Sequence, residues 1–104
     1  MLLNGVDLTR ISRFKDKSLS FAKKILSVNE FQEFQKLSDI DSKSLFLARS
    51  WAIKEAIFKA DNQYFNFSSI DLIKINKRWT FKDFSISISH EGDLLIAFVT
   101  KLVK

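Results

Sequence analysis

A long alanine-spaced segment between residues 42 and 60 constrains the fold of this chain more than any other feature. Ala48, Ala52, Ala56 and Ala60 recur every four residues within it. Residues four apart lie on one face of an α-helix, so the spacing predicts a helix over 42–60 with small side chains along one stripe. Small side chains let two backbones come close together. We therefore expect this helix to pack tightly against a sheet or against a second helix.

The segments before this helix predict one strand and several shorter helices. Residues 2–8 form a short apolar run that is typical of a strand, in which Gly5 permits a close approach or a bulge. Thr9 is a candidate N-cap for a helical segment that includes Arg10, Ile11, Arg13 and Phe14. A second helix is expected over 20–26. A third is expected after Ser27, which forms the capping-box pattern with Glu30.

After residue 63 the period changes to the alternation that is typical of strands. Imperfect alternation covers 67–75 and 79–84, and residues 76–78 are expected to form the turn between them. Apolar residues alternate with serines over 84–89, and a turn at 91–93 precedes a very apolar run to residue 103. The order is one strand, several helices and three or four antiparallel strands. It predicts an α+β fold with helices packed on an antiparallel sheet.

Composition narrows the classes of protein that remain. The 104 residues are enough for a single domain, 1–104, and the absence of cysteine excludes disulfides, thiolate metal sites and cysteine nucleophiles. No apolar run approaches the roughly 20 residues of a membrane span, and the N-terminus does not resemble a secretory leader, so we expect a cytoplasmic protein. The net charge of +5 favours an anionic partner such as nucleic acid, a phosphate-rich small molecule or an acidic protein.

Four residues have the chemistry of a metal–phosphate site. Glu55 and Lys59 share one face of the predicted helix, which by itself describes an ordinary surface ion pair. Beside a buried stripe, however, such a pair is partly desolvated, and Lys54 adds a second positive charge. A carboxylate flanked by lysines suits Mg²⁺ that holds a phosphate. Asp7, at the end of the first strand, is the natural second carboxylate, although an acid near a helix start is also favourable electrostatically.

Two further groups of residues allow either a structural or a functional interpretation. His90 is the only histidine and ends a predicted strand; nearby serines lack the G-x-S-x-G pattern of a hydrolase. Arg10, Arg13 and Lys17 would form a basic stripe on the first helix. That stripe is either a solvated face or a docking surface for an acidic partner or for phosphates. No nucleic-acid motif accompanies it, so nucleic acid is the weaker interpretation.

Several segments together resemble one family, the holo-acyl-carrier-protein synthases, which are the short class of 4′-phosphopantetheinyl transferases. These segments are GVDLTRISRF (5–14), FAKKILSVNEF (21–31), RSWAIKEAIFKA (49–60) and SISHEGDLLIAFV (87–99). They follow the family's order and spacing over nearly the whole chain. The resemblance implies transfer of the 4′-phosphopantetheine arm from coenzyme A to a serine of apo acyl carrier protein, releasing 3′,5′-ADP. Such a reaction supports fatty acid and lipid biosynthesis.

The resemblance also implies roles for individual residues. Asp7 and Glu55 would bind Mg²⁺, and Lys59 would contact the phosphates and assist the leaving group. The general base would be Glu55 or a metal-bound water. His90 would lie on the coenzyme A side of the site, where Lys54 and Arg49 match basic positions of the same motif.

Partners and assembly follow from the same resemblance. Arg13 falls where the family has an arginine that meets the carrier protein, beside Arg10 and Lys17. The short members are usually homotrimers with sites between subunits, so a homotrimer is expected here, with neither nucleic acid nor a membrane as partner. Two loops depart from the family pattern, at residues 61–64 and 76–79. The alternatives are a basic module that binds RNA or an acidic protein, and a family member that binds coenzyme A without transferring its arm.

Overall fold

The computed structural model describes all 104 residues and contains three α-helices, two short 3-10 helices and five strands. The helical elements are η1 (Ile11–Phe14), α1 (Leu19–Ile25), α2 (Val28–Gln35), α3 (Ile40–Ala60) and η2 (Phe67–Ser69). The strands are β1 (Leu2–Arg10), β2 (Ile73–Ile75), β3 (Arg78–Thr80), β4 (Ser85–Glu91) and β5 (Leu94–Leu102). The predicted α+β fold with an antiparallel sheet is confirmed.

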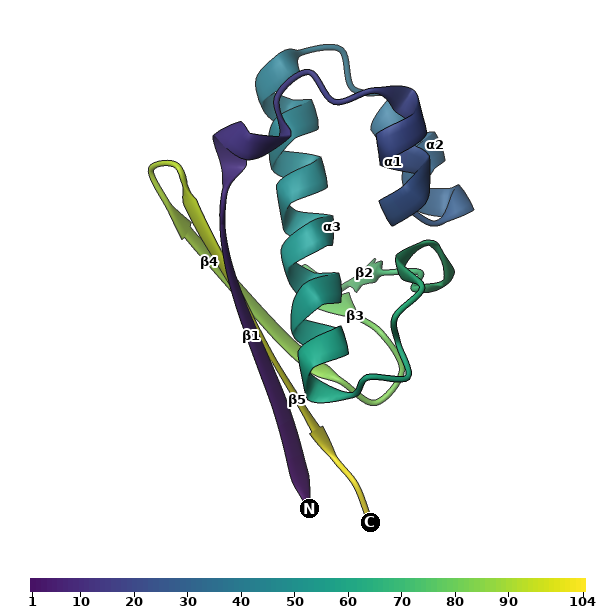
Figure 1. Cartoon of the computed structure of the whole chain (residues 1–104), viewed down its shortest axis with the longest axis vertical. Helices are drawn as coiled ribbons and strands as arrows, with labels where there is room; N and C mark the ends of the chain where they lie inside the picture. Colours follow the sequence, from purple (N-terminus) through teal and green to yellow (C-terminus); the bar gives the residue numbers. More distant parts are fainter.

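The main sheet contains the first and the last strand of the chain side by side. Its strand order is β1-β5-β4, and both pairs are antiparallel. β1 and β5 pair along their whole lengths, from Leu2 opposite Leu102 to Arg10 opposite Leu94. The two termini therefore lie side by side at one end of the molecule (Figure 1). The Met1 ammonium donates a hydrogen bond of 2.8 Å to the carbonyl oxygen of Val103, just beyond the end of β5.

Helix α3 crosses one face of this sheet and packs on β1 and β5 (Figure 1). Its fully buried alanines, Ala52 and Ala56 among them, face buried side chains of β5 such as Ala97. Gly5 makes the contact unusually close, because a Cβ atom at this position would lie 1.9 Å from the carbonyl oxygen of Ala56. The tight packing predicted from the alanine spacing is confirmed. The close approach predicted for Gly5 is confirmed with it.

The other flank of α3 carries a second apolar cluster beneath α1 and α2. Phe14, Ile25, Phe34 and Leu47 are among its buried members. The capping box expected at the start of α2 is present, because Ser27 accepts from the Glu30 amide and Glu30 accepts from the Ser27 amide. This capping box fixes α2 against the sequence that precedes it. None of the helices combines the length and hydropathy that a bilayer crossing requires.

Two predictions of local structure were wrong. Thr9 does not cap a helix: β1 continues through it to Arg10, only the 3-10 turn η1 follows, and no side chain caps that turn. The strand expected over 67–75 is reduced to β2, and the one expected over 79–84 to β3. Ile70 and Leu72 are buried in the main core, so their pattern reflects tertiary packing rather than a strand.

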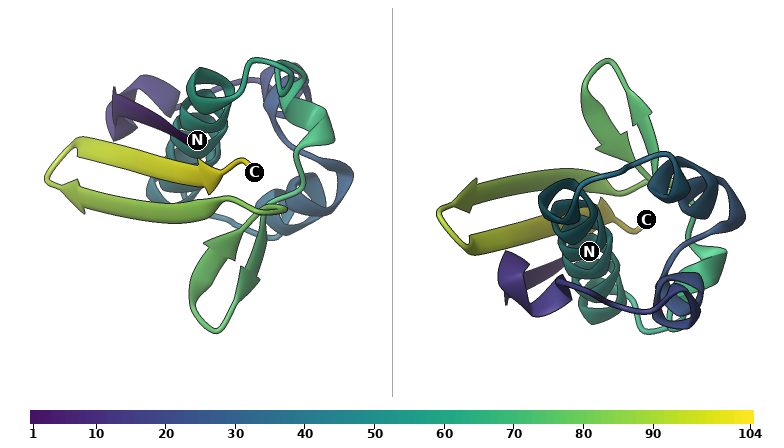
Figure 2. Two further views of the ribbon diagram at one scale, coloured as in Figure 1. Left: turned by 90° about the horizontal axis from the view of Figure 1, so that it is seen from below. Right: turned by 90° about the horizontal axis from the view of Figure 1, so that it is seen from above.

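The turn expected at residues 76–78 does connect these two short strands. Asn76 and Lys77 both have positive φ angles, 50° and 66°, as the two central residues of a tight hairpin turn of the I′ type require. The resulting β2–β3 hairpin is a separate two-stranded sheet. It projects from the body of the molecule (Figure 2).

Candidate functional site

Asp7 and Lys59 come together where β1 passes along α3. The Lys59 ammonium lies 3.2 Å from Asp7 Oδ1 and donates a second hydrogen bond, of 2.9 Å, to the carbonyl oxygen of Val6. The Lys59 side chain is 49% exposed, whereas that of Asp7 is only 13% exposed. The Lys59 side of the ion pair is therefore exposed to solvent, whereas the Asp7 side is largely buried.

Glu55 belongs to the same cluster, one helical turn before Lys59. Burial raises the pKa of Glu55 above its ordinary value of 4.5, and the negative charge of Asp7 raises it further. The positive charges of Lys59 and Arg13 act in the opposite direction. The two carboxylates thus repel one another across the junction of β1 and α3. A cation beside both would remove that repulsion.

One oxygen of this cluster has no partner. Asp7 Oδ2 is buried and accepts no hydrogen bond. A buried carboxylate oxygen without a partner is costly, and most native structures satisfy such atoms. No set of three acidic or histidine side chains surrounds the position. Two carboxylates fit Mg²⁺ well, because this ion commonly takes one or two protein carboxylates and completes its coordination with water and substrate phosphates.

Gly5 controls where Asp7 lies. The two residues are on the same face of β1, because residues two apart in a strand point the same way. The absence of a side chain at Gly5 lets β1 lie directly on the backbone of α3 at Ala56 and Ala60. Because β1 lies so close to α3, Asp7 is held against the side of this helix that carries Glu55 and Lys59. The position of Asp7 beside Glu55 and Lys59 therefore depends on a glycine that has no chemistry of its own.

Comparison with known proteins identifies the family. Residues 4–99 match the 4′-phosphopantetheinyl transferase superfamily. The chain belongs to this superfamily. It is 58% identical, over 96% of this chain and 89% of the relative, to a protein of Mycoplasma mobile named holo-[acyl-carrier-protein] synthase.

Solved structures of the family have the same fold. The Helicobacter pylori holo-[acyl-carrier-protein] synthase, crystallised in complex with coenzyme A, is 25% identical with a TM-score of 0.71; the match covers 93% of this chain and 97% of that one. The Thermotoga maritima holo-[acyl-carrier-protein] synthase is 26% identical with a TM-score of 0.75; the match covers 96% of this chain but 63% of that one.

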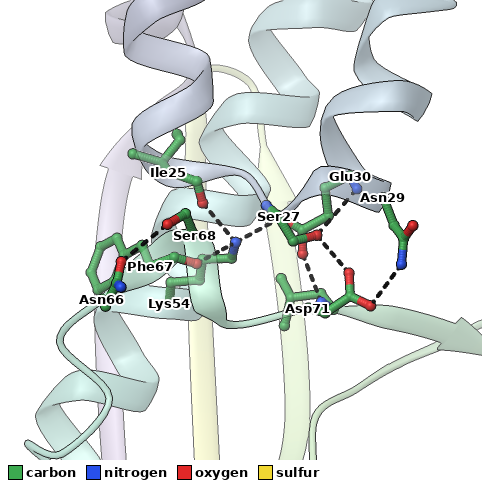
Figure 3. A network of polar contacts seen from close by, with 10 residues as sticks. Ile25, Ser27, Asn29, Glu30, Lys54, Asn66, Phe67, Ser68 and Asp71 are labelled. Atoms are coloured by element: carbon green, nitrogen blue, oxygen red, sulfur yellow. Dashed lines mark hydrogen bonds and ion pairs between the residues drawn. The ribbon is translucent and has the colours of Figure 1, made fainter.

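The sequence predicts that Lys54 helps to bind coenzyme A, and the structure corrects this prediction. The Lys54 side chain has no exposed surface, and its ammonium is paired with Glu30 rather than with the Asp7–Glu55–Lys59 cluster. All three of its N–H groups are engaged: with Glu30 Oε1 at 2.6 Å, the Ile25 carbonyl at 2.6 Å and the Phe67 carbonyl at 2.9 Å (Figure 3). An ammonium with three internal partners and no exposed surface is unavailable to coenzyme A. The positive charge beside Glu55 therefore comes from Lys59 and Arg13 instead.

The network around Lys54 was missed by the sequence analysis. Glu30 accepts from the Ser27 amide and from the Leu72 amide, at 3.0 and 2.6 Å, in addition to its bond with Lys54 (Figure 3). The Ser27 hydroxyl in turn donates to Asp71. Burial lowers the pKa of Lys54 below its ordinary value, while the charges of Glu30 and Asp71 oppose that fall. The capping box was the only sequence signal here, and it indicated only the local role of Glu30.

Arg49 also lies apart from the Asp7–Glu55–Lys59 cluster. Its guanidinium lies 4.7 Å from the centre of the Trp79 ring and 5.3 Å from that of Phe46. Burial lowers the pKa of Arg49 below its ordinary value. In a single copy of the chain, this arginine ties the β2–β3 hairpin to α3 by cation–π contacts.

His90 is exposed near the end of β4. It lines a cavity of about 310 Å³ together with residues of η1, the residue that follows η1, and the first turns of α3, including Ser12, Lys15 and Asp41. β4 is separated from β1 by β5, so strand spacing places the Cα atoms of His90 and Asp7 roughly 12 Å apart. The structure does not bring His90 into the Asp7–Glu55–Lys59 cluster of the same copy.

The expected basic stripe is not a face of one helix. Arg10 ends β1, Arg13 lies in η1, and Lys17 lies in the loop before α1. All three are exposed, but only Arg13 reaches the candidate site, since its charge acts on Glu55 and its guanidinium lies 5.1 Å from the Trp51 ring centre. The three residues lie at one end of the molecule but belong to different elements.

Proposed function

We propose that this chain transfers the 4′-phosphopantetheine arm from coenzyme A to a serine of apo acyl carrier protein, releasing 3′,5′-ADP. The observation that carries the proposal is the cluster of Asp7, Glu55 and Lys59, in which a buried carboxylate oxygen has no partner within the chain. Membership of the transferase superfamily supports the same reaction. So do relatives whose names specify acyl carrier protein as the substrate.

Asp7 and Glu55 are the residues that would hold Mg²⁺. Their carboxylate oxygens are the hard ligands that this ion prefers, and burial together with the charge of Asp7 raises the pKa of Glu55. When bound, Mg²⁺ would neutralise charge on the pyrophosphate oxygens of coenzyme A as the phosphoryl group is transferred. Asp7 and Glu55 come from different elements, so the contact between β1 and α3 sets the distance between them.

Lys59 would bind the phosphates. An ammonium has three N–H donors, and two of those in Lys59 are used by Asp7 and Val6. The third is free to donate to a pyrophosphate oxygen from a side chain that is half exposed. Because β1 holds the Lys59 ammonium through Val6 and Asp7, the lysine contributes positive charge that is already in position, which is how enzymes stabilise phosphoryl transfer.

In the reaction, the serine oxygen of the carrier protein forms a bond to the phosphorus that bears the pantetheine arm. The bond from that phosphorus to the bridging pyrophosphate oxygen breaks, and 3′,5′-ADP leaves with the electron pair. Lys59 stabilises the charge that develops on the leaving phosphate. The serine proton passes to Glu55 or to water at the site. No nucleophile of the chain itself is required.

The chain also has the surface that a homotrimer with shared sites would need. The outer face of β1 and β5, opposite α3, exposes apolar side chains that no other element covers. They are Leu2, Val6, Leu8, Leu94, Ile96, Phe98 and Leu102. An apolar patch of this kind is typical of an interface between subunits. We include self-association in the proposal because His90 and Arg49, which lie away from Asp7 in one copy, would then be able to reach the coenzyme A of a neighbouring copy.

Self-association is tested by light scattering after size-exclusion chromatography. The wild-type chain should elute as a trimer, and Phe98→Lys should shift it to the monomer with helical content retained. Gln32→Lys, on the exposed surface of α2 and away from this sheet face, is the matched control. A wild-type monomer at tens of micromolar would contradict this part of the proposal.

The acyl carrier protein would dock through the exposed cations near η1. Arg13 is unsuitable as the only test residue, because its charge also acts on Glu55. Lys17 has no such contact and stacks instead on the Phe21 ring. Lys17→Glu should raise the KM for the carrier protein more than the KM for coenzyme A. Equal effects on both would argue against docking at this end.

Intact-mass spectrometry of apo acyl carrier protein tests the reaction itself. Incubation with the chain, coenzyme A and Mg²⁺ should add the mass of one phosphopantetheine arm, and EDTA should prevent the gain. Glu55→Gln should abolish it, whereas Glu33→Gln, which changes a glutamate on exposed α2 surface, should not. Folded protein that modifies none of several carriers would overturn the proposal. Salt-dependent RNA binding without Mg²⁺ would then favour a binding module instead.

A further inference from the structure

Thr9 carries the second unpartnered oxygen of the protein interior. Its side chain is only 5% exposed, and its Oγ1 makes no hydrogen bond. Asp7 Oδ2 is the one other buried side-chain atom in this condition. The two residues are two apart on β1, so both side chains point from the sheet toward α3. The two unsatisfied oxygens of the molecule are neighbours on one face of one strand.

No local role explains the Thr9 hydroxyl. The sequence predicts it as a helix cap, but η1 begins later and no side chain caps it. Thr9 lies near the end of β1, and its cross-strand partner on β5, Leu95, is a buried apolar residue. Valine has the same shape as threonine and would fill this position without burying an unpartnered hydroxyl. In the chain on its own, the hydroxyl only costs stability.

We infer that Thr9 is a positioning residue of the metal site, whose hydroxyl hydrogen-bonds to a water in the hydration shell of the cation held by Asp7 and Glu55. The inference rests on the proposed function. Cα atoms two residues apart in a strand are separated by about 7 Å, which suits two side chains that share an ion through an intervening water. Mg²⁺ dehydrates reluctantly and keeps several waters in protein sites. A buried hydroxyl beside one ligand would orient such a water.

The same arrangement explains why both oxygens are unsatisfied together. Asp7 Oδ2 would gain the cation, and Thr9 Oγ1 would gain the water, so one binding event would satisfy both atoms. Groups that hydrogen-bond to the ligands of a metal, as Thr9 would, change the metal affinity without being ligands themselves. Thr9 would therefore affect Mg²⁺ binding while contributing nothing favourable to the metal-free fold.

Thr9→Val tests the inference through two measurements with different expected directions. Calorimetric titration with Mg²⁺ in the presence of coenzyme A should show about tenfold weaker binding of the metal, in the range seen when such supporting partners are removed. In EDTA, the melting temperature should be unchanged or higher, because an unpartnered buried hydroxyl has been removed. Thr9→Ser, which restores the hydroxyl, should bring the Mg²⁺ affinity back toward the wild-type value. Thr100→Val on β5 is the control and should leave it unchanged.

The outcomes separate this inference from the proposed function. Wild-type Mg²⁺ affinity in Thr9→Val, together with lost affinity in Asp7→Asn, would overturn the role of Thr9 alone. Unchanged affinity in both variants would overturn the metal site and this inference together. A lower melting temperature of Thr9→Val in EDTA, without a change in Mg²⁺ affinity, would show a purely structural role for the hydroxyl and would also overturn the inference.

Discussion

Lys54 and Glu55 are consecutive residues of α3 with opposite surroundings. Lys54 lies on the α1–α2 flank, where Glu30 and two backbone carbonyls satisfy every N–H of its ammonium. Glu55 lies on the β1 flank, near the repelling charge of Asp7 and the unpartnered Asp7 Oδ2. One helix thus carries a closed network of charges on one side and an incomplete cluster on the other.

The comparison distinguishes charged groups whose hydrogen bonds are complete within the fold from charged groups that keep an unpartnered atom. A buried pair whose hydrogen bonds are complete has no capacity left for a substrate, but removing one partner leaves a charge stranded. An incomplete cluster contributes little to folding, and its unsatisfied atoms are available to bind. In this chain the satisfaction of hydrogen bonds, rather than charge or burial alone, distinguishes Lys54 and its closed network from the incomplete cluster of Asp7, Glu55 and Lys59.

The largest expected effect is on stability, at the closed network. Lys54→Met should lower the free energy of unfolding by about 3–5 kcal/mol, because it strands the Glu30 carboxylate and two carbonyls in the interior. Glu55→Gln should change it by less than about 1 kcal/mol, since it removes a charge that burial and Asp7 already disfavour. Urea unfolding of both variants measures the contrast. Similar losses in the two would remove the distinction between the networks.

An intermediate effect is expected at Gly5, where the incomplete cluster depends on backbone packing. Gly5→Ala should cost roughly 1–3 kcal/mol, because its Cβ forces β1 away from the Ala56 carbonyl. It should also weaken Mg²⁺ binding, because Asp7 moves with the strand. Gly92→Ala is the matched control: nothing lies within 4 Å of its Cβ, so it adds only the strain of a φ of +56°. Unaltered Mg²⁺ affinity in Gly5→Ala would show that the site tolerates a wider spacing.

The smallest effect is expected at Asp93, a carboxylate that is satisfied like Glu30 but fully exposed. Its Oδ1 accepts from the Ser12 amide at 2.8 Å and its Oδ2 from the Ser12 hydroxyl at 2.6 Å, and these bonds lower the pKa of Asp93 below 3.8. A lowered folded-state pKa stabilises the fold above the unfolded value of about 3.9 and loses that contribution as pH falls through the folded value.

The pH dependence of thermal unfolding tests this contribution. Asp93→Asn should melt slightly below wild type at pH 7, and the gap should close as the pH is lowered below about 4. Asp83→Asn, which changes an exposed aspartate that forms no hydrogen bond or ion pair in the structure, should show no such pH-dependent gap. If the gap between wild type and Asp93→Asn were constant down to pH 2, the Ser12 bonds would not be the source of the stabilisation.

Local periodicity was enough to predict the elements whose side chains face one uniform surface. The alanine spacing predicted α3, and the capping box predicted the start of α2. Both end strands followed from their apolar patterns. The same local signals selected Asp7, Glu55 and Lys59 as candidates, and the structure brings these three residues together. Family membership was also evident from the motifs alone.

Only the tertiary structure decided which charges face which surface. A single step along a helix turns by about 100°, so adjacent residues such as Lys54 and Glu55 always point differently. Which of them is buried depends on where α1 and α2 pack, and that is set by contacts distant in sequence. The same reason explains the misassigned cap at Thr9 and the separation of Arg49 and His90 from Asp7. Periodicity describes one element at a time, whereas a site is formed where several elements meet.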